Sequence, residues 1–262
     1  MIAWTTGWRR ASRRIDDVRV ADRAMPAVQL STGGASFQTK QQFAYQVLRQ
    51  AIMRCELLPG KRLIIDDIAR QLGMSLIPVR EALQLLQSEG LIDTVPHVGA
   101  VVAPISRSSV IDTFTVMEGI ETVAMRTAAE RMTADDLLLL RELVDQMDAA
   151  VAADEHQRWG DLNTDFHVAI ARTTAMPLLL EVTRRAFSAW DRIRRYYFDG
   201  VLVRRIPRSQ QQHHAIVAAL EGRDLPALES LARVHNQEAL AAYLSYIQAD
   251  GAAAPSPEKD QR

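Results

Sequence analysis

Apolar residues recur at three- and four-residue spacing along almost the whole chain between residues 37 and 249. This spacing gives each helix one apolar face that turns toward a core, so it predicts a succession of α-helices. The stretch from Leu91 to Pro104 differs, because it is rich in Val and Ile and is interrupted by Pro96 and Gly99. Such a stretch is typical of a short β-hairpin. The pattern therefore predicts a small helical head that carries a β-wing, followed by a larger all-helical body.

The two ends of the chain lack this pattern. Residues 1–36 show no helical periodicity and end in a Ser/Gly/Ala-rich stretch, and residues 250–262 are rich in Ala, Pro and charged residues. Both ends are predicted to be flexible tails, and Met25 is an alternative start of the chain. Between them we expect a head of residues 37–105 and a body of residues 106–249.

The head is predicted to contain three helices. The first ends before Pro59, the second begins near Asp66 or Asp67, either of which can cap it, and Gly73 ends it with a tight turn. Ser75 is the expected N-cap of the third helix. The side chains expected to face solvent on this third helix are Leu76, Ile77, Arg80, Gln84 and Gln87.

Two short helices joined by a glycine-containing turn, the second of which exposes Arg and Gln, have the geometry that enters the major groove of DNA. The predicted fold class is therefore mainly α, with an N-terminal winged helix-turn-helix and a C-terminal all-helical antiparallel bundle. Arg80 is the predicted central contact, since Arg can donate two hydrogen bonds to guanine. The full predicted DNA-binding set is Lys40, Ser75, Leu76, Ile77, Arg80, Gln84, His97 and Gly99, the last two at the tip of the wing.

Charge adds no support to this hypothesis. The chain has 31 basic and 32 acidic side chains, a net charge of -1, and residues 37–105 carry seven basic against six acidic side chains. A nucleic-acid-binding module usually shows a larger basic excess. A small helical bundle without a DNA partner explains the helical periodicity of the head equally well.

A more specific signal lies in four runs of residues. These are Leu58-Pro-Gly-Lys-Arg-Leu63, Ile68-Ala-Arg-Gln-Leu-Gly-Met-Ser75, Pro78-Val-Arg-Glu-Ala-Leu83 and Glu89-Gly-Leu91. They resemble the DNA-binding head of the GntR family of bacterial transcriptional regulators. The resemblance implies that a homodimer binds double-stranded operator DNA through the recognition-helix arginine and the wing glycine. Leu76 and Val98 stand where this family usually or often has Arg, so we expect weaker or differently specified DNA binding.

In the body, two histidines are placed symmetrically about a predicted turn. His213 lies nine residues before Gly222, and His235 lies eleven residues after Asp224. If residues 222–224 form the turn of a helical hairpin, the two histidines lie nearly opposite each other, each roughly 15 Å from the turn. Asn163 and His167 are four residues apart and share one helix face. Three imidazoles and one oxygen ligand suit a borderline divalent ion.

A single histidine in a helical bundle is more often a packing or surface residue than a ligand, and His156 and His214 are interpreted in this way. The segments around the other three histidines resemble the C-terminal FCD domain of FadR-type GntR regulators. The resemblance implies a helical sensor bundle whose metal is held by Asn163, His167, His213 and His235. Zn²⁺ fits imidazole ligands best, and Ni²⁺ or Mn²⁺ also fits. An amide in place of the usual Asp lowers the expected affinity.

The resemblance also implies a small-molecule effector, such as an organic acid, a sugar acid or an amino-acid-like metabolite. The effector pocket is predicted to include Glu118, Glu121 and Arg192. The family commonly has Arg where Glu118 stands, and this acid reverses the local charge preference. An alternative for Arg192 is a solvated or ion-paired helix face.

Composition and missing motifs exclude several other classes of protein. The single cysteine, Cys55, excludes an internal disulfide and a Cys-rich zinc module and fits a reducing cytoplasm. No apolar stretch approaches the ~20 residues that span a bilayer, so we expect a cytoplasmic protein without a membrane partner. The chain lacks an H-E-x-x-H helix and a phosphate-binding loop, so no enzyme is predicted. The alternatives are a metal-dependent hydrolase that uses the three histidines and a metal-free helical interaction module.

Overall fold

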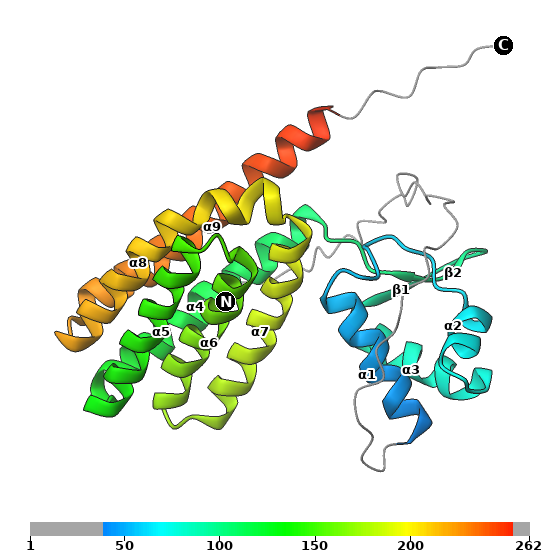
Figure 1. Cartoon of the computed structure of the whole chain (residues 1–262), viewed down its shortest axis with the longest axis horizontal. Helices are drawn as coiled ribbons and strands as arrows, with labels where there is room; N and C mark the ends of the chain where they lie inside the picture. Colours follow the sequence, from blue (N-terminus) through cyan, green and yellow to red (C-terminus); the bar gives the residue numbers. More distant parts are fainter. Residues whose placement is uncertain (1–38, 254–262) are drawn as a thin grey trace, which may run out of the picture. The chain divides into compact units, whose positions relative to one another are not determined.

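The computed structural model describes residues 39–253 and the side chains of residues 39–249 (Figure 1). This part of the chain forms two compact units. The first comprises residues 39–47 and 59–103, and the second comprises residues 48–58 and 104–253. The predicted tail of residues 1–36 lies outside the described residues. The last helix continues to Ala253, so residues 250–253, which were predicted as tail, are helical.

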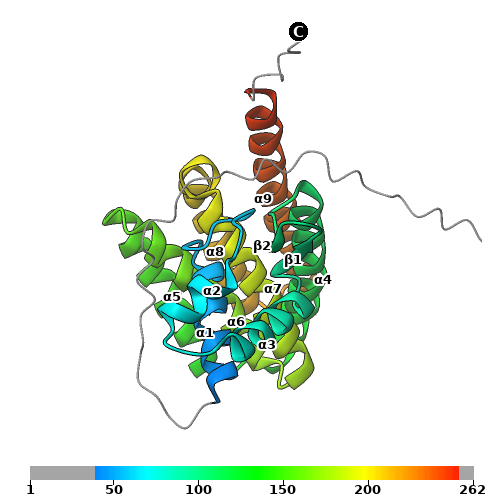
Figure 2. The same ribbon diagram turned by 90° about the vertical axis from the view of Figure 1, so that its right-hand side faces the viewer.

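The N-terminal region contains the three predicted helices and the predicted hairpin (Figure 2). Its elements are α1 (Lys40–Met53), α2 (Ile65–Gln71), α3 (Leu76–Ser88), β1 (Ile92–Val95) and β2 (Gly99–Val102). The two strands are antiparallel, with Ile92 opposite Val102 and Val95 opposite Gly99. Arg62 pairs with Val101, which adds a short third segment to the hairpin. A winged helix-turn-helix is thus confirmed.

The ends of α2 and α3 follow from local chemistry. Gly73 adopts a φ of 62°, a left-handed conformation that glycine reaches without strain, and it separates the two helices as predicted. Ser75 is the N-cap of α3. The predicted cap of α2 was wrong, because Ile64 occupies that position. Asp66 and Asp67 lie in the first turn instead, where their charges stabilise the positive end of the helix dipole.

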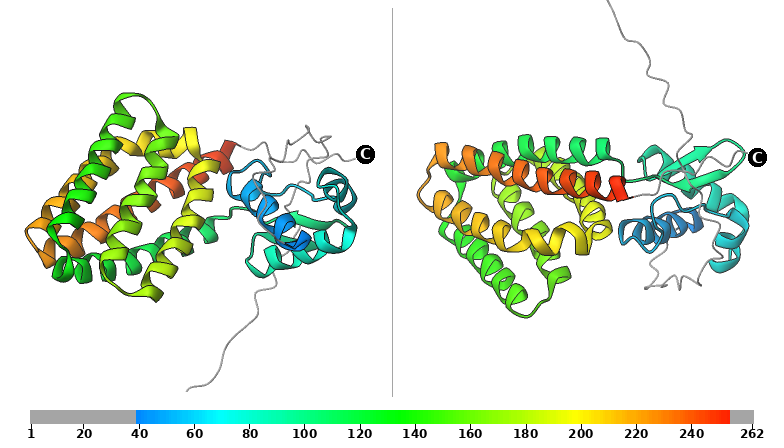
Figure 3. Two further views of the ribbon diagram at one scale, coloured as in Figure 1. Left: turned by 60° about the horizontal axis from the view of Figure 1, so that its bottom comes forward. Right: turned by 90° about the horizontal axis from the view of Figure 1, so that it is seen from above.

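The second unit is a bundle of long helices (Figure 3). Its elements are α4 (Arg107–Arg131), α5 (Ala134–Ala152), α6 (His156–Thr173), α7 (Pro177–Tyr196), the π-helical turn η1 (Phe198–Leu202), α8 (Val203–Glu221) and α9 (Leu225–Ala253). Capping boxes start α4 at Ser106 and α5 at Thr133. Helix α9 packs along α4 and α8, and α6 packs between α5 and α7. The predicted all-helical body is confirmed.

The apolar spacing after Pro177 predicts a core stripe of Val182, Ala186, Trp190, Ile193 and Tyr197, and the first of these positions was wrong. Val182 on α7 is exposed, whereas Thr183 and Phe187 are buried together with Ala186 and Trp190. Ala186, Trp190 and Ile193 are buried as predicted, so only the first position of the stripe differs, with Thr183 buried in place of Val182. Phe187 and Trp190 lie in the interior beside α6, where they help to line a cavity.

Candidate functional site

The exposed face of α3 carries the residues predicted to contact DNA. Val79, Ala82, Leu83 and Leu86 are buried and hold the helix to the core of its unit. Arg80 and Gln84 are exposed on the other side, and the side chain of Ile77 is 67% exposed. Ser75 is exposed and Leu76 is half-buried at the start of the helix, and Lys40 is exposed at the start of α1. The packing of α3 thus leaves its polar face open.

The turn of the hairpin presents the predicted wing residues. His97 and Gly99 are both exposed, and Val98 between them is half-buried. His97 has a φ of 63° and Gly99 a φ of 96°. A side chain at the second position would be strained, so glycine there lets the chain reverse between β1 and β2.

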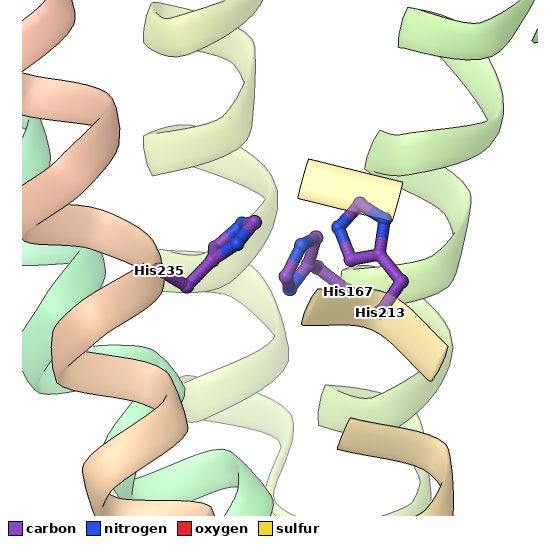
Figure 4. A group of neighbouring side chains, drawn as sticks. All are labelled: His167, His213 and His235. Carbon is purple, nitrogen blue, oxygen red and sulfur yellow. The ribbon is translucent and has the colours of Figure 1, made fainter. Parts of the chain in front are cut away.

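In the second unit, three histidines from three helices meet in the interior (Figure 4). His167 lies on α6, His213 on α8 and His235 on α9. Each offers a nitrogen, and these atoms all lie within 4.8 Å of one another. Their exposed fractions are 2%, 0% and 7%. Burial lowers the pKa of all three, and the pKa of His235 falls to about 3. The rings are therefore neutral near pH 7, which is the form that binds a metal.

The ring of His213 is oriented by Gln210. The amide nitrogen of Gln210 donates to the carbonyl of Val144 at 3.1 Å and to Oδ1 of Asp148 at 2.7 Å. Its oxygen must therefore face Trp159 Nε1, at 3.0 Å, and His213 Nδ1, at 3.4 Å. An oxygen there accepts a hydrogen bond, so Nδ1 of His213 carries the proton and Nε2 is left with a free lone pair.

A second glutamine orients His235 in the same way. The amide nitrogen of Gln212 donates to Oε2 of Glu238 at 3.0 Å, and its oxygen accepts from Nη2 of Arg205 at 2.9 Å. The same oxygen lies 3.0 Å from Nδ1 of His235. His235 therefore donates from Nδ1, and its Nε2 is free to act as a ligand.

His167 differs, because neither of its nitrogens makes a hydrogen bond among the described residues. Its Nδ1 lies 3.1 Å from Oε1 of the buried Glu121, without the geometry of a hydrogen bond. Burial raises the pKa of the Glu121 carboxyl to about 8, although Asn236 donates to that carboxyl and opposes the shift. Nε2 of His213 also has no partner among the described residues. Unpartnered nitrogens that face one another are the donor set expected of a metal centre.

A small cavity lies beside this cluster. It offers about 30 Å³ to the centres of water-sized molecules, enough for roughly two waters or a small ligand group. Its lining combines aromatic and apolar side chains with six polar ones. The lining residues are Phe114, Met117, Trp159, Asn163, Phe187, Trp190, Leu202, Arg205, Ser209, His235, Asn236, Ala239 and Tyr243.

Only some of the predicted site residues line this cavity. Asn163 is buried and lines it, as does His235. Glu121 is buried behind His167, outside the lining. Glu118 is half-buried and faces Gln237, whose Nε2 donates to it at 3.3 Å. Glu118 is thus placed away from the cavity.

Arg192 is buried but is also outside the lining. It lies two residues after Trp190, which is roughly 200° round the helix from a side chain that does line the cavity. Arg205, Asn236 and Tyr243 line the cavity instead, and the sequence analysis missed them. The available signal was the spacing of Arg205 and Tyr243, which lie eight residues from His213 and His235, and Asn236 gave no such signal.

Comparison with known proteins identifies the class. Residues 40–102 match the bacterial regulatory proteins of the gntR family, and residues 112–238 match the FCD domain. The chain therefore belongs to the GntR family and is a transcriptional regulator with an FCD domain. Both families and the named relatives are regulators and not enzymes, so the hydrolase alternative is not retained.

Two curated relatives come from Escherichia coli K12. The HTH-type transcriptional regulator McbR is 27% identical over 191 residues, which cover 72% of this chain and 86% of McbR. The HTH-type transcriptional repressor RspR is 28% identical over 201 residues, which cover 77% of this chain and 87% of RspR.

Solved structures show the same fold. The structure of E. coli McbR/YncC matches with a TM-score of 0.62 and 25% identity and covers 80% of this chain and all of that one. A GntR regulator from Rhodococcus sp. RHA1 matches with a TM-score of 0.65 and 23% identity, over 79% of this chain and 99% of that one. Among the described residues, no helix has the length and apolar character to cross a membrane.

Proposed function

We propose that this regulator binds operator DNA as a homodimer through α3 and the wing, and that a small molecule bound in the second unit changes its operator affinity. The proposal places it with the FadR-type members of the family and in the cytoplasm. The observation that carries it is the exposure of Arg80 on a helix whose opposite face is buried. A side chain presented in this way can reach base edges without disturbing the core.

The first turn of α3 favours a distinct mode of recognition. Leu76 replaces the arginine that the family resemblance leads one to expect, and Ile77 beside it is largely exposed. Apolar side chains at the start of a recognition helix suit the methyl group of thymine. Arg80 and Gln84 then supply the hydrogen bonds, and Lys40, Ser75, His97 and Gly99 are proposed to contact the DNA backbone and the minor groove.

The three histidines fit a divalent metal ion, Zn²⁺ in the first place, with Ni²⁺ or Mn²⁺ as alternatives. His167, His213 and His235 would hold it through neutral ring nitrogens, and those of His167 and Nε2 of His213 have no hydrogen-bond partner among the described residues. Asn163, one helical turn before His167, is the proposed oxygen ligand. A bound ion would supply a Lewis-acidic position toward the cavity, and Gln210 and Gln212 would keep two of its ligands in the required tautomer.

Helices α4 and α7 offer a surface for the homodimer. They pack against each other, and each carries exposed apolar side chains at helical spacing. These are Val116 and Val123 on α4 and Leu178 and Val182 on α7. Exposed apolar side chains on two adjacent helices are typical of an interface between subunits. In a dimer, the separation of the two recognition helices must match the spacing of the operator half-sites, so a ligand that changes the dimer geometry changes operator affinity.

The DNA-binding part of the proposal is tested with a duplex selected from a random-sequence pool by the purified protein. Arg80→Ala should weaken binding of that duplex by about tenfold or more and leave binding of a random duplex nearly unchanged. Arg233→Ala, which also removes an exposed charge but from α9, is the control and should bind like the wild type. Equal binding of the selected duplex by the wild type and Arg80→Ala would reject the role of α3.

A further inference from the structure

Three side chains in the cavity lining carry buried polar atoms that have no hydrogen-bond partner among the described residues. These atoms are Oδ1 of Asn236, the hydroxyl of Tyr243 and Nε of Arg205. Asn236 and Tyr243 are 1% and 2% exposed. A buried polar atom without a partner is destabilising, so three of them in one cavity indicate groups that a ligand satisfies.

The orientation of the Asn236 amide is fixed by its neighbours. Its nitrogen donates to Oε2 of Glu121 at 2.6 Å and to the carbonyl of Ala232 at 3.0 Å, and both partners are acceptors. Both N–H groups are therefore used, and Oδ1 remains as an acceptor. A ligand group beside Oδ1 must donate a hydrogen bond.

The other two atoms are donors. Burial raises the pKa of the Tyr243 hydroxyl, so this group stays protonated and can donate. Arg205 is mostly buried, and its Nη atoms contact Glu238 at 3.3 Å and Gln212 at 2.9 Å, which leaves Nε without a partner. Two donors, one of them on a cation, suit an anionic oxygen.

The remaining lining restricts the size and charge of the ligand. Among the described residues that line the cavity there is no Asp or Glu, and Glu238 is already paired with Arg205 and Arg208, so a ligand ammonium beside Arg205 would lack a countercharge of its own. The walls of Trp159, Phe187 and Trp190 are aromatic, and the cavity has room for only a few heavy atoms. The donor that faces Asn236 is therefore a neutral hydroxyl.

From this arrangement we propose that the cavity selects a small 2-hydroxycarboxylate. Its carboxylate accepts from Arg205 Nε and the Tyr243 hydroxyl, and its hydroxyl donates to Asn236 Oδ1. This inference rests on the proposed function, since it names the ligand class of the same sensor site.

The test compares three probes that differ at one substituent. The purified full-length protein is titrated calorimetrically with glycolate, acetate and glycine, which carry a hydroxyl, a hydrogen and an ammonium group at the same carbon. Glycolate should bind at least about tenfold more tightly than either other probe. Equal affinities, tighter binding of acetate or glycine, or binding of none of the three would overturn the assignment.

Two variants locate the interactions. Tyr243→Phe should weaken the binding of glycolate and of acetate by the same factor, because it removes a donor to the carboxylate that both molecules carry. Asn236→Leu should reduce the affinity for glycolate to that for acetate, because it removes only the acceptor of the hydroxyl. The unfolding midpoint of each variant shows whether it folds. If Asn236→Leu fails to fold, the comparison of the three probes in the wild type and the result for Tyr243→Phe decide the proposal. A preference for glycolate that survives Asn236→Leu in folded protein would contradict the assigned hydroxyl partner.

The two proposals fail separately. Binding of the selected duplex with no preference for glycolate would reject the ligand class and leave the regulator intact. A preference for glycolate in a protein that binds no duplex specifically would reject the DNA-binding proposal and leave the ligand class intact.

Discussion

The two units place their candidate functional residues in opposite environments. On α3, Arg80, Gln84 and Ile77 are exposed, and a separate set of apolar side chains holds the helix in place. In the bundle, His167 and His213 are fully buried, and the polar atoms around them depend on one another for hydrogen bonds. On α3, the residues that are proposed to bind DNA are not those that stabilise the fold. In the bundle, the same buried side chains are proposed to contribute to both ligand binding and stability. Substitutions in the two units should therefore behave differently.

The largest expected effect is on metal binding. His213→Ala combined with His235→Ala removes two of three converging nitrogens. We therefore expect the wild type to retain stoichiometric metal after dialysis and the double variant to retain none. Elemental analysis of both proteins measures this. His214→Ala, which changes the exposed neighbour of His213, is the matched control and should keep the metal. Undiminished metal in the double variant would reject the site.

The next largest effect contrasts two isoleucines. Ile170→Ala on α6 deletes a side chain that is 1% exposed and should lower the free energy of unfolding by about 2–5 kcal/mol. Ile77→Ala on α3 removes an exposed side chain and should change it by no more than about 0.5 kcal/mol. Urea unfolding followed by circular dichroism measures both. Similar losses in the two variants would mean that α3 is not a surface helix.

A smaller effect is expected at Gly160 on α6. An added Cβ would collide with the guanidinium of Arg194, which is buried on α7 and ion-paired with Asp161 and Asp191. Because this side chain is held by both carboxylates, Gly160→Ala should destabilise the protein by about 1–3 kcal/mol. Gly119→Ala on α4, where a Cβ meets nothing within 4 Å, is the control and should not destabilise. Unchanged thermal stability of Gly160→Ala would show that Arg194 can move.

The smallest effect concerns the first turn of α3. Leu76→Arg restores a charge that the family resemblance leads one to expect, so it should tighten DNA binding a few-fold at low salt. It should also steepen the dependence of log K on log salt by roughly 0.9. Fluorescence anisotropy at several salt concentrations measures both quantities. An unchanged slope would show that position 76 does not meet a phosphate.

The sequence predicted the head well because its signals are local. Gly73 and Ser75 mark the start of α3, and the Val- and Ile-rich stretch around Pro96 and Gly99 marks the hairpin. Each feature depends on neighbours a few residues away. The expected cap at Asp66 or Asp67 was wrong by two or three residues, which is the scale at which local signals lose resolution.

The body was less predictable because its site is built from distant segments. The spacing about residues 222–224 brought His213 and His235 together correctly, since both lie on one hairpin. Arg205, Asn236 and Tyr243 were missed, because the cavity forms only where five helices and η1 meet. Glu118 was chosen from the family resemblance and Arg192 from the edge of the α7 face. Both lie outside the cavity lining, one and two residues after the lining residues Met117 and Trp190.

The most direct test of the account is whether occupancy of the second unit changes the DNA affinity of the first. The dissociation constant for the selected duplex is measured with and without a saturating amount of the organic acid that most raises the unfolding midpoint in a panel. The account predicts a change of at least about fivefold in the wild type and none in the His213→Ala, His235→Ala variant. An unchanged dissociation constant for the duplex, measured while the acid is bound to the wild type, would contradict the proposed coupling between the two units.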